Sequence, residues 1–136
     1  MIIGNDQTFI HLELSEPATA SLPGADYLAL DITISDNGFS GYSDLVWFST
    51  IQIQQFLSHP ESSHLILRSL HGINHRNNFS LHIMTFASGQ VMVTASLQKQ
   101  IFVIDKYLPS SVKVAFELTV KGLSQIKNEF NDFFMP

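Results

Sequence analysis

The chain contains no cysteine. Disulfide bonds, thiolate catalysis and metal sites built on cysteine are therefore excluded. Charge is also scarce, because Asp, Glu, Lys and Arg make up 14% of the residues, against about 25% in an average soluble domain. Mean hydropathy is +0.15, so uncharged polar and some apolar side chains must cover the surface. That composition favours a protein that docks to another molecule.

The sequence also lacks targeting and membrane signals. Its first residues show no basic region followed by an apolar stretch, the pattern of a signal peptide. No apolar run approaches the roughly 20 residues that a membrane helix needs. We therefore expect one cytoplasmic domain over residues 1–136, with no membrane partner.

Positive charge is missing from the first half of the chain. Residues 1–67 hold no Lys or Arg, and they hold eight carboxylates: Asp6, Glu13, Glu16, Asp26, Asp31, Asp36, Asp44 and Glu61. Residues 68–136 hold seven bases and four acids, so the halves carry −8 and +3, which sum to the net charge of −5. This segregation predicts an acidic surface that repels nucleic acid and attracts basic partners. The alternative is that the acids scatter over unrelated turns.

Apolar and polar residues alternate through most of the chain, as they do in half-buried strands. Alternation over residues 28–35 and 42–48, joined by Asp36-Asn37-Gly38, predicts a hairpin. Similar patterns predict strands at 65–70, 79–84, 91–97, 101–104 and 112–118, with a turn at Ser88-Gly89. The short connections favour antiparallel pairing.

Helical spacing occurs twice. Residues 50–58 carry an apolar stripe after a possible capping box of Ser49 and Gln52, and Pro60 follows. Thr119 is a predicted N-cap for a second helix, whose apolar face would contain Leu123, Ile126, Phe130 and Phe133. The predicted fold is α+β: a single twisted antiparallel sheet of about seven or eight strands, with two helices packed on it.

Motifs for common chemistry are missing. The sequence has no phosphate-binding loop, no dinucleotide fingerprint and no His-Glu-x-x-His motif. His71 and His75 have the i, i+4 spacing of metal ligands, yet their neighbours indicate a loop, and no carboxylate lies between Glu61 and Asp105. We interpret them, and His82, as ordinary surface residues. We predict no catalytic residue, no metal and no cofactor; a small-ligand pocket or enzyme built on these histidines is the alternative.

Candidate partner-binding residues lie on the first hairpin. Asp31 and Asp44 are expected on the same outward face, where paired acids could receive a Lys or Arg from a partner. Asp36 at the turn and Tyr42 on the returning strand complete the candidate set. A solvated sheet with no binding role is the alternative. Phe133 and Phe134 suggest a third possibility, an exposed apolar terminus through which the chain forms a homodimer.

A resemblance adds to this interpretation. The segments that carry it are Gly38-Phe39-Ser40-Gly41, Trp47, Phe56-Leu57, Phe79-x-Leu81-x-Ile83, Gly89-x-Val91-x-Val93 and Phe116-Glu117-Leu118-Thr119 with Leu123 and Ile126. Over residues 27–134 this order resembles the WapI-like immunity proteins, although that family has an acidic residue where Thr119 stands. The resemblance implies a small cytosolic antitoxin that binds the C-terminal domain of a bacterial toxin. We therefore expect a non-enzymatic, toxin-binding protein.

Overall fold

The fold contains two four-stranded antiparallel sheets, where the sequence predicts a single sheet. The computed structural model describes residues 1–15, 26–58, 64–70 and 77–134. Sheet A is ordered β1 (Ile2–Gly4), β2 (Thr8–Leu14), β3 (Tyr27–Asp36) and β4 (Phe39–Ser49). Sheet B is ordered β5 (His64–Arg68), β6 (Asn77–Thr85), β7 (Val91–Val103) and β8 (Lys106–Leu118). Helix α1 (Thr50–Ser58) joins the sheets, and α2 (Val120–Phe134) ends the chain.

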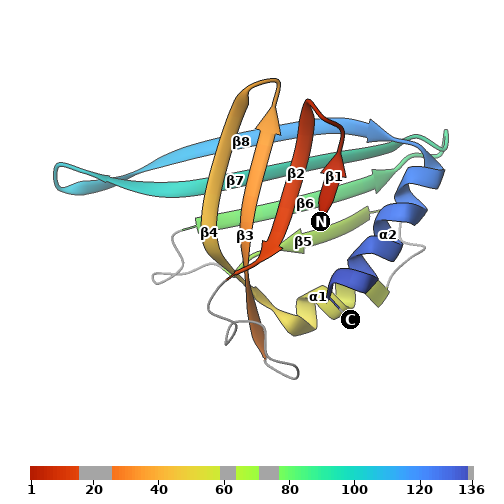
Figure 1. Ribbon diagram of the computed structural model, residues 1–136, viewed down its shortest axis with the longest axis horizontal. Coiled ribbons are helices and arrows are strands. Elements are labelled where there is room, and N and C mark those ends of the chain that lie inside the picture. Colours follow the sequence, from red (N-terminus) through yellow and green to blue (C-terminus); the bar gives the residue numbers. More distant parts are fainter. Residues whose placement is uncertain (16–25, 59–63, 71–76, 135–136) are drawn as a thin grey trace.

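The α+β class and the antiparallel pairing are confirmed, and the single sheet is wrong. Short connections determine that consecutive strands run antiparallel, but they do not determine which strands share a sheet. The break falls at α1, which carries the chain from β4 to β5. In Figure 1 the strands of sheet A run across those of sheet B, the arrangement of an orthogonal sandwich.

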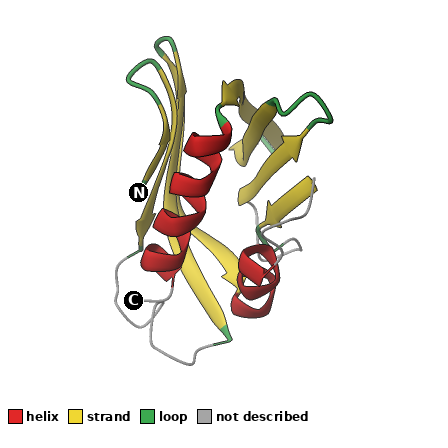
Figure 2. Cartoon of the chain, turned by 90° about the vertical axis from the view of Figure 1, so that its right-hand side faces the viewer, coloured by secondary structure: helices red, strands yellow, loops and turns green. Residues whose placement is uncertain are grey.

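The core lies between the two sheets and is closed by the helices. Alternate residues of both sheets are buried; examples are Ile32 and Ile34 on β3, and Leu81 on β6. Figure 2 shows α2 lying across the gap between the sheets, and its Ile126 and Phe130 belong to the core. Phe133 and Phe134 are half-buried and pack against the core as well. Neither side chain is fully exposed, and a homodimer formed through this terminus stays a prediction.

The helix boundaries follow the sequence closely. Helix α1 spans the predicted residues 50–58, and its first residue, Thr50, donates from both N–H and Oγ1 to the carbonyl of Asp26. Helix α2 begins directly after Thr119, whose Oγ1 accepts a hydrogen bond of 3.0 Å from the N–H of Gly122. The predicted N-cap is confirmed, since this contact satisfies an N–H group that the helix leaves without a partner.

The β7–β8 hairpin is longer than the sequence pattern predicts. Each strand has 13 residues, so the strand expected at 101–104 is part of β7 and of the following turn. Lys99, Gln100 and Pro109 look like strand breakers, yet they pair in register within the hairpin. Residues 101–111 are all exposed, and Figure 1 shows the hairpin projecting well beyond β4. We call residues 99–111 the arm.

Ile104 at the tip of the arm is in an unfavourable conformation. Its φ is 63°, in the left-handed region, and its side chain is 90% exposed. A β-branched residue is strained in that region, which asparagine tolerates. We expect Ile104→Asn to raise the free energy of unfolding by about 1 kcal/mol, measured by denaturant unfolding. Ile101→Asn, within the strand, is the control and should bring no gain. Equal or lower stability of Ile104→Asn would show that the isoleucine side chain packs well enough to offset the strain.

Candidate interaction surface

Three carboxylates lie around an exposed tyrosine on the outward face of sheet A. Glu13 on β2 pairs with Asp31 on β3, and Tyr42 on β4 pairs with Thr33. The phenol of Tyr42 has a raised pKa, first because of desolvation and then because of the negative charges of Asp31, Asp44 and Glu13. Tyr42 is 56% exposed. We call Glu13, Asp31, Tyr42 and Asp44 the acidic patch.

A β-bulge shapes this patch. Leu30 pairs with Val46 and Ile32 pairs with Ser43, so two residues of β4, Asp44 and Leu45, oppose the single residue Asp31. Leu45 has a φ of 51°. Ser43 and Val46 are buried while the two bulge residues are exposed. Alternation places Asp44 on the outward face with Tyr42, and the extra residue Leu45 returns Val46 to the core side.

The carboxylate of Asp31 stabilises the bulge through hydrogen bonds. Its Oδ1 accepts hydrogen bonds from the N–H of Leu45 at 3.1 Å and from Oγ of Ser15 at 2.5 Å. The first of these satisfies a backbone N–H that the bulge removes from the β3–β4 ladder. Asp31 is half-buried, whereas Glu13 and Asp44 are exposed. Glu13 and Asp44 are thus the carboxylates best placed to meet a partner, and Asp31 positions one of them.

Asp36 lies away from the patch. Its Oδ1 accepts hydrogen bonds from Thr8 Oγ1 at 3.0 Å and from Asn37 Nδ2 at 3.1 Å, at the β3–β4 turn. Five residues of strand, about 16 Å, separate it from Asp31. Of the four predicted binding residues, the structure brings together Asp31, Tyr42 and Asp44, and it leaves Asp36 apart.

Glu13 was not among the predicted binding residues. The signal was available, because Ile10 and Leu12 alternate with His11 and Glu13 along β2, and the first pair is buried. His11 Nε2 lies 3.2 Å from Glu13 Oε1. The pattern is short and starts near a turn, so the sequence does not show that β2 lies beside β3.

Charge is segregated by sheet. The strands of sheet A contain four acids, Glu13, Asp31, Asp36 and Asp44, and no Lys or Arg. The strands of sheet B contain one acid, Glu117, and four bases: Arg68, Lys99, Lys106 and Lys113. The imbalance between the two halves of the sequence therefore becomes an imbalance between the strands of the two sheets.

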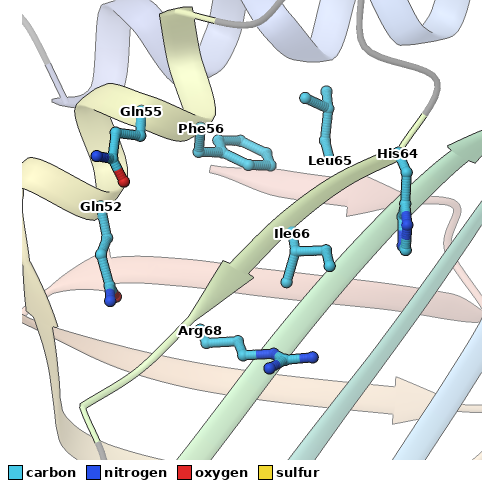
Figure 3. A pocket seen from close by; sticks show the side chains of 7 residues that line it. All are labelled: Gln52, Gln55, Phe56, His64, Leu65, Ile66 and Arg68. Carbon is cyan, nitrogen blue, oxygen red and sulfur yellow. The ribbon is translucent and has the colours of Figure 1, made fainter.

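The outward face of sheet B carries a pair of imidazoles. The rings of His64 on β5 and His82 on β6 lie 5.6 Å apart. An open depression of about 550 Å³ lies nearby, between α1 and β5. Figure 3 shows its lining, which includes Gln52 and Gln55 from α1 and His64 and Arg68 from β5. Among the described residues that line it there is no carboxylate, and His82 is not one of them.

His71 and His75, the pair with metal-ligand spacing, lie outside the described residues. Among the residues that are described, no group of three or more His, Asp or Glu side chains could hold a metal ion. No helix within the described ranges is both long enough and apolar enough to cross a membrane.

His82 should make stability depend on pH. Partial burial, then the positive charge of Arg68, then His64, lower the pKa of His82. The unfolded chain therefore binds the proton more tightly than the folded chain does. The contribution of neutral His82 to stability is complete above the unfolded pKa of about 6.5, and it is lost as the pH falls through the lower pKa of the folded chain. We expect His82→Gln to reduce the loss of melting temperature between about pH 7.5 and 5. An unchanged pH profile in this variant would contradict the assignment.

Comparisons with protein families, with curated proteins and with solved structures find no match to this chain. The resemblance to the WapI-like immunity proteins therefore stays a prediction.

Proposed function

We propose that this chain is a non-enzymatic immunity protein that binds and neutralises a cognate toxin domain through the acidic patch. The observation that carries the proposal is the cluster of Glu13, Asp31 and Asp44 around the exposed Tyr42, on a sheet whose strands contain no Lys or Arg. A basic protein surface is the complementary partner.

The form of the patch favours docking of a macromolecule over catalysis. The carboxylates lie on an open sheet face, where water has access, and paired catalytic acids work best in a cleft that excludes it. Tyrosine is enriched at the centres of protein interfaces, because its rigid ring buries much area and its hydroxyl can form a hydrogen bond. Tyr42, near the exposed carboxylate of Asp44, therefore suits a hot spot for Lys or Arg side chains.

Electrostatics would also speed capture of such a partner. Charged patches of opposite sign raise association rates, and the gain falls with ionic strength. An antitoxin that must bind its toxin before damage occurs benefits from a fast association rate. The acidic face of sheet A supplies the necessary field.

Binding to the toxin domain encoded by the neighbouring reading frame tests this function. The two proteins should co-purify at low and at moderate salt, with an association rate that falls at least about tenfold between the two conditions. Failure to form a complex at either salt concentration would contradict the proposal. A complex whose association rate is the same at both salt concentrations would contradict the role of the acidic patch.

A further inference from the structure

The outer strand of sheet A has an open edge. β4 is the last strand in the order β1-β2-β3-β4. In the described part of the chain, one backbone hydrogen bond reaches it from outside sheet A, from the N–H of Leu70 to the carbonyl of Trp47 near the end of the strand. The stretch from Phe39 to Leu45 is exposed at most positions. An open edge of this kind is a template for another strand.

The turn determines which backbone groups face that edge. Asn37 and Gly38 have φ of 49° and 95° and form a two-residue hairpin turn, so Asp36 and Phe39 are the first hydrogen-bonded pair. Bonded and non-bonded pairs then alternate along an antiparallel ladder. Ser40 and Tyr42, in non-bonded pairs, therefore direct their N–H and C=O groups toward the open edge.

The arm extends sheet B beyond this edge. A Cβ atom at Gly41 would lie 2.8 Å from Cγ2 of Val112, so β4 rests directly on the base of the arm. Ile101 pairs with Leu108, and Val103 is the next residue on the same face. This face continues the core surface of β7 and β8, and it also carries Lys99 and Lys106. Its three apolar side chains are 39–45% exposed.

The arm is long enough to cover added strands. From Lys99 to Val103 it extends about 13 Å, which is nearly three strand spacings. Sheet A therefore ends while sheet B continues, and a strand added beside β4 would cross the arm and cover its apolar face. The free edge of β8 suits pairing less well, because Pro109 lies there in a non-bonded pair and has no N–H to offer.

The side chains of β4 and of the arm determine which residues such an added strand should carry. Its outward residues would lie beside Tyr42 and Asp44, where Lys or Arg fits best. Its inward residues would lie on Ile101 and Leu108, where apolar residues fit best. We propose that the open edge of β4 and the inner face of the arm form a slot for an extended partner segment in which basic and apolar residues alternate. The proposed function supplies the identity of the partner, a toxin domain. The sequence pattern expected of the segment does not depend on that function.

A peptide titration tests the slot directly. The probe is a short, capped peptide of alternating lysine and valine, and the control peptide alternates glutamate and valine. The lysine peptide should shift the amide resonances of Ser40 and Tyr42, and the glutamate peptide should not. Absence of shifts at Ser40 and Tyr42, or equal shifts with both peptides, would overturn the proposal.

Two matched pairs of variants test the two sides of the slot. Ser40→Pro removes an N–H that faces the open edge and should weaken binding of the lysine peptide at least about tenfold, whereas Ser40→Ala should not. Ile101→Asn should weaken it about threefold or more, while Phe102→Asn, on the opposite face of the arm, should leave it unchanged. Folding of each variant is checked by its melting temperature. Equal effects within either pair would overturn the slot.

Failure of the slot and failure of the antitoxin function are distinguishable. If the toxin domain binds the native chain and the Ser40→Pro variant equally well, the slot is wrong and the function stands. If no toxin domain binds, but the lysine peptide binds and both pairs of variants give the expected differences, the slot stands and the partner is another protein with such a segment.

Discussion

Phe130→Ala is expected to lower the free energy of unfolding by about 3–5 kcal/mol, the range for truncating a fully buried phenylalanine. Phe130 is 0% exposed. Its ring lies 5.2 Å from that of Phe56 on α1 and 5.7 Å from that of Phe134. Truncation would leave a cavity where α2 meets α1 and the core, and neighbouring side chains could fill it only in part. Denaturant unfolding measures the effect.

The control for this variant is Phe102→Ala on the arm. Phe102 is 60% exposed and contacts Tyr107 at a ring distance of 5.0 Å, so its loss should cost less than about 1 kcal/mol. Similar losses in the two variants would contradict the described packing of α2. A loss below about 1 kcal/mol in Phe130→Ala would contradict it as well.

The double variant Tyr42→Ala/Asp44→Lys is expected to weaken binding to the toxin domain by on the order of 100-fold. The first change removes a predicted hot-spot ring, and the second places a positive charge opposite the basic surface expected on the partner. Both residues are exposed on sheet A, so the variant should fold normally. Affinity is measured by calorimetry, together with the association rate.

Tyr27→Ala/Asp132→Lys is the matched control. Tyr27 is 53% exposed and Asp132 lies exposed on α2, outside the acidic patch. The net charge changes by the same amount, so general attraction is weakened equally. An equal loss of affinity in the two double variants would show that net charge alone guides binding, and the assignment of the acidic patch would be wrong.

Local features of the fold could be predicted because short-range physics determines them. The Asn37-Gly38 turn, the span of α1 and the cap at Thr119 each depend on residues close in sequence. The division into two sheets could not be predicted in this way. It depends on which strands pack face to face across the core, and alternating patterns on all strands are compatible with either arrangement.

The arm and the patch show the same limit. Lys99, Gln100 and Pro109 look like a loop by composition, but a projecting hairpin tolerates polar residues and a proline at its edge. The shared face of Asp31 and Asp44 follows from alternation, whereas the role of Asp31 in the bulge does not. Alternation would place Asp44 on the same side as Tyr42, but the extra residue Leu45 appears only in the β3–β4 register.

Hydrogen exchange of the chain in complex with the toxin domain shows whether the partner docks on sheet A. Exchange should slow along β4 from Phe39 to Leu45 and along neighbouring β3, and sheet B around Ile66 and His82 should be unchanged. Slowed exchange confined to sheet B, with β4 exchanging as in the free chain, would contradict docking on sheet A.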